Sequence, residues 1–163
     1  METKIGDIIK IKINGKEYNK PHVSWITDSF MCTNGKNVVI DKYENISQLS
    51  SWPSCIQGGP LLVKDGRTVA FDDKKDPSYF KKPTTRSFAC TIKDNQVVLG
   101  VTDLVDLYSL AAALSKPKEQ EGLGCQNAIL LTGGATAGMA VRNGEKDFYG
   151  YADALLPNVI VIE

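Results

Sequence analysis

The charged residues best placed for chemistry in this chain are Asp28, Arg86 and Asp103. Asp28 lies in the segment WITDSF, Arg86 opens the apolar segment RSFACTI, and Asp103 follows VVLGVT. A guanidinium buried without a partner is costly, so Arg86 needs either an internal ion pair or an anionic ligand. Its planar fork suits two-point contact with a phosphate group. The residue pattern alone leaves both roles open.

Glycines and hydroxyls supply the other candidate contacts. The segment NAILLTGGATAGM, residues 127–139, runs from an apolar strand into a glycine pair, and a second glycine pair precedes PLLVKDG. Glycine lacks the Cβ that holds a ligand away from the backbone, so these positions are suited to a binding floor. The predicted ligand-binding residues are Thr27, Ser29, Gly58, Gly59, Arg86, Ser87, Thr132, Gly133, Gly134 and Thr136.

The sequence lacks the residue patterns that several other kinds of chemistry require. The single histidine, His22, stands beside a proline before a strand, and we interpret it as a structural or surface residue. The four cysteines, Cys32, Cys55, Cys90 and Cys125, form no CxxC pair, so we expect buried free thiols and no zinc site. No phosphate-binding Walker loop or dinucleotide GxGxxG motif is present. We therefore expect no metal and no cofactor.

Composition restricts the partners. Nineteen basic residues balance nineteen acidic ones over 163 residues, so no net positive field attracts duplex nucleic acid or an anionic membrane. The N-terminal segment METKIGDIIKIKING lacks the apolar centre of a signal peptide, and no later run is long enough to span a bilayer. The expected location is the cytoplasm and the expected partner is a small molecule; the sequence leaves homo-oligomerisation open.

Short strands and turns dominate the predicted organisation. Alternation over residues 8–13 and the Asn14-Gly15 turn predict an opening hairpin, and Asn34-Gly35 separates strands predicted at 23–30 and 37–41. Asp65-Gly66 predicts a hairpin within residues 59–71. Further strands are predicted at 86–93, 95–102, 127–131 and 158–162. The segment from Asp72 to Thr85 is charged and holds two prolines, so we expect a solvated loop and leave open whether it is a lid.

One helix is predicted. Between Asp103 and Ser115, leucines, alanine and tyrosine recur at spacings of three and four, with Asp103 available as the N-cap. Pro117 ends the helix, and its leucine face should pack on the sheet. The predicted fold is α+β, with a mainly antiparallel β-sheet of many short strands packed against one principal helix in a single domain, residues 1–163.

The order and spacing of GGPLLVKDG, TTRSFAC and LLTGGAT resemble the phosphodiester glycosidase family. Its members carry a Gly-Pro-type strand, then Arg-Thr-Ala-Ile-Gly, an Asp-Gly strand end, an amphipathic helix and Asn-Leu-Asp-Gly-Gly-Gly-Ser. The resemblance extends from about Val23 onward. It aligns Arg86-Ser87 with the Arg-Thr pair and Asp103 with the Asp of the Asp-Gly turn. It implies the family's fold, a phosphate-linked sugar or nucleotide as ligand, and Arg86 as its phosphate contact.

The sequence departs from this family at two motifs. WITDSFM replaces the Asn-Gly-Gly core of Ile-Asn-Gly-Gly-Phe-Phe, and Thr132 stands in place of the Asp that precedes the final glycines. Threonine does not ionise at neutral pH, so a hydrolase would need Asp28 and Asp103 as catalytic carboxylates, with Arg86 stabilising the leaving phosphate. The alternative is a binder that has lost its chemistry and sequesters the ligand. A structural or protein-interaction module is the third interpretation.

Overall fold

Short strands form two five-stranded sheets and a separate hairpin. The computed structural model describes residues 11–17, 24, 26–45, 51–71, 77–143, 146–150 and 160. The strands are β1 (Ile11–Ile13), β2 (Lys16–Glu17), β3 (Ser29–Thr33), β4 (Val38–Lys42), β5 (Ser54–Gly58), β6 (Leu61–Lys64), β7 (Arg67–Thr68), β8 (Thr84–Thr91), β9 (Val97–Val105), β10 (Asn127–Gly133), β11 (Met139–Asn143) and β12 (Lys146–Gly150). The helices are α1 (Pro77–Lys81) and α2 (Leu107–Ser115).

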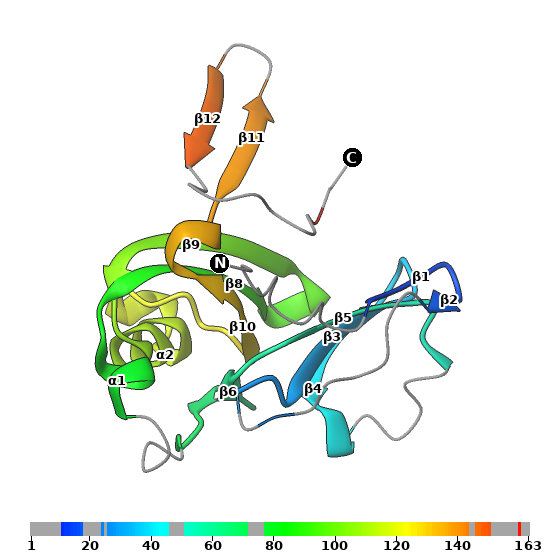
Figure 1. The fold of residues 1–163 in the computed structure, drawn as a ribbon, viewed down its shortest axis with the longest axis horizontal. Coiled ribbons are helices and arrows are strands. Elements are labelled where there is room, and N and C mark those ends of the chain that lie inside the picture. Colours follow the sequence, from blue (N-terminus) through cyan, green and yellow to red (C-terminus); the bar gives the residue numbers. More distant parts are fainter. Residues whose placement is uncertain are drawn as a thin grey trace, which may run out of the picture.

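Both sheets are antiparallel throughout. The first has the strand order β2-β1-β5-β3-β4 and the second β7-β6-β10-β8-β9, while β11 pairs with β12 (Figure 1). The chain passes from the first sheet to the second through Gly59-Pro60, between β5 and β6. The predicted α+β class is confirmed, with two sheets rather than one.

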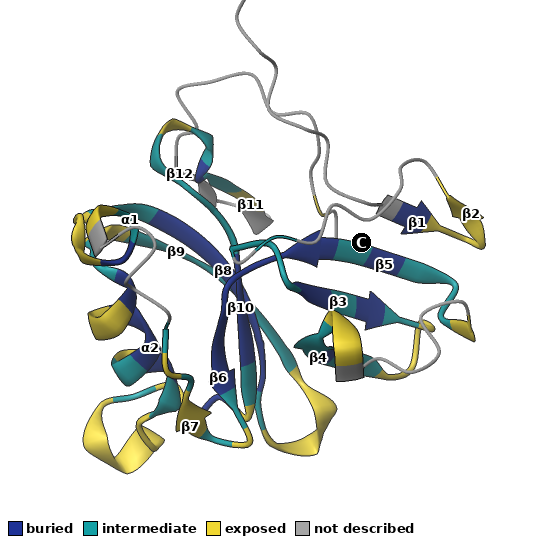
Figure 2. Cartoon of the chain, turned by 60° about the horizontal axis from the view of Figure 1, so that its bottom comes forward, coloured by how far each residue is buried: buried dark blue, intermediate teal, exposed yellow. Residues whose placement is uncertain are grey.

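The second sheet is buried on both faces. One face packs on α1 and α2 through Phe88, Cys90 and Leu130, among others. The other face packs on the first sheet, where Ile40 meets Ala89 and Ile129. Figure 2 shows β8 and β10 at the centre of the molecule, between the helices and the first sheet. Residues that alternate along β8 and β10 therefore enter two different environments.

The predicted helix starts later than its periodicity suggested. α2 begins at Leu107, and Asp106 is its N-cap: the backbone N–H of Ser109 donates to this carboxylate over 2.9 Å and the Ser109 hydroxyl over 2.6 Å. The prediction of Asp103 as N-cap is wrong because β9 continues to Val105 and pairs there with Thr84. The end of the helix at Ser115, just before Pro117, is as predicted.

Turn residues located the hairpins well. Asn14-Gly15 and Asp65-Gly66 both have positive φ at each position, as a two-residue hairpin turn requires, and they join β1 to β2 and β6 to β7. The strand predicted at residues 23–30 instead begins at Ser29 and continues to Thr33, three residues past its predicted end. β5 was not predicted because SCIQG has a single branched apolar residue.

The segment expected to be an irregular loop contains structure. α1 occupies Pro77–Lys81, and its Phe80 is 2% exposed and packs in the helix-side core. β8 already begins at Thr84. An aromatic residue that packs in a core overrides the local preference of a charged, proline-flanked segment for solvent. Residues 72–76 lie outside the described residues, so the lid role is not decided.

The cysteines are paired, so the prediction of free thiols is wrong. Cys32 bonds to Cys55, its directly opposite neighbour on β3 and β5, and Cys90 on β8 bonds to Cys125 before β10. Wide sequence spacing concealed both pairs, because strand pairing brings distant residues together. Disulfides persist mainly in oxidising compartments. The described residues do not test the expected cytoplasmic location, which stays a prediction.

Three further sequence expectations concern residues outside the described ranges. His22 and residues 8–10 lie outside the described residues, and so does the strand expected at 158–162, apart from Ile160. Among the described helices, none has the length and apolar character needed to cross a membrane.

Candidate functional site

Arg86 and Gly133 are neighbours at one end of the second sheet. They pair directly across β8 and β10. A Cβ on Gly133 would stand 3.0 Å from Arg86 Nη1, 3.2 Å from Arg86 Cδ and 3.2 Å from the Thr85 carbonyl oxygen. The missing side chain of Gly133 therefore makes room for the arginine to cross the end of β10.

Arg86 is a buried cation held by backbone oxygens. The side chain is 4% exposed, and Nη2 donates to the carbonyl oxygens of Tyr79 and Lys82, each over 3.2 Å. Its guanidinium carbon lies 5.7 Å from the centre of the Tyr79 ring. Among the described residues, no carboxylate forms an ion pair with it. The internal ion pair, one of the two roles that the sequence leaves open for Arg86, is therefore not seen in the described part of the chain.

Burial and two nearby groups set the electrostatics of Arg86. Burial lowers the pKa of Arg86, while Tyr79 and Asp106 raise it. Burial also raises the pKa of the Tyr79 phenol, and the charge of Arg86 opposes this. An arginine keeps its proton at any physiological pH, so the site holds a permanent positive charge.

Thr102 is a polar residue of this region that sequence reasoning missed. It lies on β9 directly opposite Arg86, so both side chains share the helix-side face of the sheet. Within the described part of the chain, Arg86 Nε and Thr102 Oγ1 are the two buried side-chain N or O atoms with no hydrogen-bond partner. Only the strand pairing, which is not visible in the sequence, places them together.

The predicted hydroxyl residues lie on the other face or at the turn. Ser87 and Thr132 are directly opposite each other on β8 and β10. Because Ser87 follows Arg86 along a strand, it points to the face that packs on the first sheet. Thr132 and Thr136 share a short hydrogen bond between their hydroxyls, and the Thr136 hydroxyl also donates to the Gly133 carbonyl over 3.1 Å.

Gly134 continues this hydroxyl-lined turn. It has a φ of +68°, and its carbonyl oxygen accepts a 2.8 Å hydrogen bond from the Thr85 hydroxyl. The structure thus groups the predicted residues Thr132, Gly133, Gly134 and Thr136 around one strand end, with Arg86 on one face and Ser87 on the other.

A second group of predicted residues meets β10 through Gly59. The Gly59 N–H donates to the Leu130 carbonyl over 2.8 Å. Gly59 has a φ of +139°, and a Cβ there would stand 2.5 Å from the Ile26 carbonyl oxygen and 3.1 Å from the Asp28 nitrogen. A Cβ on Gly58 would stand 2.7 Å from the Leu130 oxygen. Both glycines therefore permit close backbone packing: Gly58 and Gly59 lie against Leu130 of β10, and Gly59 also lies against the segment 26–28.

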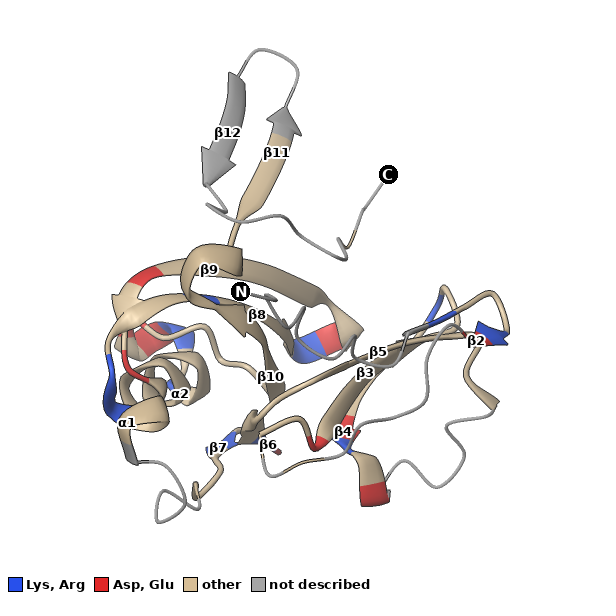
Figure 3. Ribbon diagram, viewed as in Figure 1, with Lys and Arg blue, Asp and Glu red and all other residues tan. Residues whose placement is uncertain are grey.

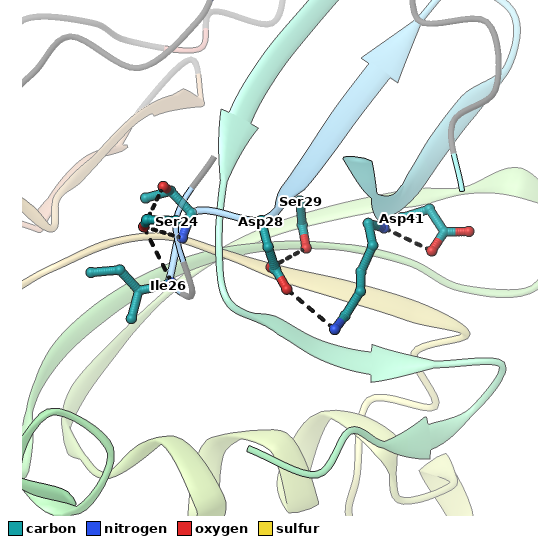
Figure 4. A network of polar contacts seen from close by, with 7 residues as sticks. Ser24, Ile26, Asp28, Ser29 and Asp41 are labelled. Carbon is teal, nitrogen blue, oxygen red and sulfur yellow. Dashed lines mark hydrogen bonds and ion pairs between the residues drawn. The ribbon is translucent and has the colours of Figure 1, made fainter. Parts of the chain in front are cut away.

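Asp28 has its carboxylate engaged within this second group (Figure 4). Its Oδ2 lies 3.2 Å from Lys42 Nζ, and the Ser29 hydroxyl donates to Oδ1 over 2.7 Å. The Thr27 carbonyl oxygen accepts a 2.7 Å hydrogen bond from the Gln57 side chain, and the Thr27 and Ser24 hydroxyls are 2.8 Å apart. Lys42, absent from the sequence prediction, is the cation of this network.

Asp103 directly follows Thr102 on β9, but it is exposed. β9 is an edge strand, and one of the Asp103 carboxylate oxygens accepts from the N–H of Leu104 over 2.9 Å. The acid whose charge acts on Arg86 is instead Asp106, whose pKa is lowered by the hydrogen bonds from the side chain and backbone of Ser109. The catalytic roles predicted for Asp28, Arg86 and Asp103 stay predictions.

A cavity lies at the opposite end of the second sheet. Its volume is about 480 Å³, and its lining includes Ile92, Lys93, Lys118, Leu123 and Gln126. None of the predicted site residues lines it. Elsewhere, acidic and basic residues are interspersed along the described ribbon (Figure 3), and the described residues hold no group of three or more histidine, cysteine, aspartate or glutamate side chains able to bind a metal ion.

Comparison with known proteins places this strand end in context. A family model for phosphodiester glycosidases matches residues 3–163, nearly the whole chain. The chain belongs to the phosphodiester glycosidase family. The family explains why the glycine-rich strand end and the arginine strand occur together, as the motif order suggested. No curated protein matches.

One solved structure supports the fold. The chain is similar to the zebrafish N-acetylglucosamine-1-phosphodiester alpha-N-acetylglucosaminidase catalytic domain auto-inhibited by its pro-peptide, with a TM-score of 0.60 and 16% identity over 79% of this chain. A hypothetical protein from Synechocystis matches with a TM-score of 0.43 and 15% identity, over 72% of this chain and 30% of its own. The chain covers 46% of the zebrafish domain, about half its length.

Proposed function

We propose that this chain acts on a phosphate-linked sugar or nucleotide, which it binds at the Arg86 and Gly133 strand end, and that it hydrolyses the glycosidic bond to the phosphate. The observation that carries the proposal is the buried Arg86 guanidinium, which lies against Gly133 and has an unpartnered Nε. A permanent buried cation without a carboxylate partner among the described residues is suited to an anionic ligand. Membership of the phosphodiester glycosidase family favours a phosphate group as that anion.

The proposed reaction makes modest demands on proton transfer. Water adds to the anomeric carbon as the bond from that carbon to the phosphate oxygen breaks, and the phosphate leaves with the bonding electron pair. A phosphate monoester has a second pKa of about 6, so its departure needs little protonation. Arg86 stabilises the charge that develops on the leaving group. A single carboxylate, Asp28, then suffices to take the proton from water.

A binder that sequesters the same ligand is the second candidate. Asp28 already contacts Lys42 and Ser29, Asp103 is exposed, and Thr132 occupies the position of the family's Asp. These observations leave the phosphate contact intact and supply no free carboxylate beside it. In this role the protein would retain its ligand unchanged.

Incubation with a panel of sugar 1-phosphodiesters and nucleotide sugars distinguishes the candidates. The products are separated by chromatography after removal of the protein, so that hydrolysed and retained ligand are both measured. Release of free sugar supports the hydrolase. Tight retention of an intact ligand supports the binder. If no compound of the panel is hydrolysed or retained, both candidates are contradicted.

A further inference from the structure

We propose that Arg86 and Thr102 form one two-donor site that takes a single oxygen of a phosphate group. Thr102 is a contact that neither the sequence motifs nor the family resemblance indicates. The inference rests on the proposed function, because it names how the phosphate of the same ligand is held. It also makes a separate prediction about the protein without ligand.

The first step is the pairing of the two unsatisfied atoms. Arg86 Nε and Thr102 Oγ1 are buried and without partners, and their residues are direct neighbours on β8 and β9 with side chains on the same face. Buried polar side-chain atoms are otherwise hydrogen-bonded in most proteins. Two such exceptions at one cross-strand pair indicate a shared acceptor.

The chemistry of the two groups defines that acceptor. A guanidinium Nε is a donor only, and a threonine hydroxyl can donate, so one oxygen placed between them accepts from both. A water molecule would satisfy these donors but would add no negative charge beside Arg86. An anionic oxygen satisfies the donors and the charge together.

The remaining contacts of Arg86 fix the direction of approach. Nη2 is occupied by the carbonyl oxygens of Tyr79 and Lys82, which hold the guanidinium against the end of α1. Nη1 lies over Gly133. Nε is therefore one donor left for the ligand on the Thr102 side, and the phosphate oxygen meets it on the helix-side face of the β8–β9 pair.

The test compares phosphate binding and stability in matched variants. Thr102→Val removes the hydroxyl with little change of shape, Thr102→Ser keeps a hydroxyl, and Thr91→Val changes another buried threonine at the far end of β8. Inorganic phosphate and N-acetylglucosamine 1-phosphate are titrated by calorimetry at constant ionic strength. Thermal unfolding is measured without ligand.

The expected results differ between the two measurements. Thr102→Val should weaken phosphate binding about tenfold, the scale of one hydrogen bond to a charged group, while Thr102→Ser and Thr91→Val bind like the wild type. Without ligand, Thr102→Val should unfold at the same or a higher temperature than the wild type, because a buried unsatisfied hydroxyl has been removed.

Three outcomes would overturn the proposal that Arg86 and Thr102 share a phosphate oxygen. They are unchanged phosphate affinity in Thr102→Val, a lower unfolding temperature of that variant without ligand, and no phosphate binding by the wild type. Failure of the proposed function looks different. In that case inorganic phosphate binds with the expected dependence on Thr102, but the sugar phosphate binds no tighter and no phosphodiester is hydrolysed.

Discussion

The two ends of β10 differ in whether nearby polar groups find partners inside the protein. At the Asn127 end, the Gln126 N–H donates to the Thr91 carbonyl over 2.7 Å, the Gly66 N–H donates to the Gln126 carbonyl over 2.8 Å, and Cys125 is bonded to Cys90. At the Gly133 end, Arg86 Nε and Thr102 Oγ1 have no partner among the described residues. One end anchors the fold, and the other has two unsatisfied buried atoms that we propose as ligand contacts. Changes at the first end should therefore affect stability, and changes at the second should affect binding.

The largest expected effect on stability comes from the anchored end. Replacing Cys90 and Cys125 by serine removes a crosslink between residues 35 positions apart. The chain-entropy model assigns such a crosslink about 4 kcal/mol of unfolding free energy. Denaturant unfolding should show this loss, while phosphate affinity of the folded variant stays that of the wild type. Equal stability of the variant and the wild type would mean that the thiols are free, as the sequence analysis expected.

The largest expected effect on binding comes from Arg86. Arg86→Met removes the only described buried guanidinium beside Gly133, and should weaken phosphate binding about a hundredfold or more, the usual scale for losing one member of a buried charge pair. Calorimetry measures the affinity, and Arg86→Lys should recover only part of it because a lysine lacks the planar fork.

Stability separates this role from a structural one. Arg86 also donates to the carbonyl oxygens of Tyr79 and Lys82, and Arg86→Met loses these bonds but also removes a buried charge, so the net loss of unfolding free energy should be about 1 kcal/mol. A loss of stability without ligand as large as the loss of binding energy would show that Arg86 mainly fastens α1 to the sheet.

Sequence patterns located the motifs better than they located the side chains. The glycine pairs and the RSFACTI strand identified the strand end, and turn dipeptides placed most hairpins, because these signals are local. The register between strands is not local: it placed Thr102 beside Arg86 and sent Ser87 to the opposite face. Both disulfides and the contact of Asp28 with Lys42 also depend on strand pairing, so the sequence did not predict them.

Replacing Asp28 tests whether the chain is a hydrolase that uses this carboxylate as its base. If the chain is a hydrolase that uses this carboxylate, Asp28→Asn should slow turnover about a hundredfold or more, the scale of losing a general base, while ligand affinity is largely kept. Steady-state kinetics on the hydrolysed compound measures both. Turnover that survives Asp28→Asn unchanged would exclude Asp28 as the base. The partly exposed ion pair with Lys42 should contribute less than about 1 kcal/mol to stability.

The smallest effect is expected at Asp106, which lies beside the unsatisfied end but has its own partners. Asp106→Ala removes the N-cap of α2 and should lower the unfolding free energy by about 1 kcal/mol. Asp106→Asn is the matched control, because asparagine also caps helices but carries no charge. Hydrogen bonds from Ser109 lower the pKa of Asp106 below its ordinary value of 3.8.

The sign of the pH effect follows from this lowered pKa. The ionised carboxylate is favoured in the folded state, so its stabilising contribution is present above pH 3.8 and is lost as the pH falls below that value. The unfolding free energies of the wild type and Asp106→Asn, measured with denaturant, should therefore converge toward low pH, by a small amount because solvent screens this acid.

Phosphate affinity should rise less than about threefold in Asp106→Asn and return to the wild-type value at high salt, since only a screened charge near Arg86 has been removed. A rise or fall of tenfold would instead mean that Asp106 contacts the ligand, and the unsatisfied end of β10 would then include an acid as well as its two donors.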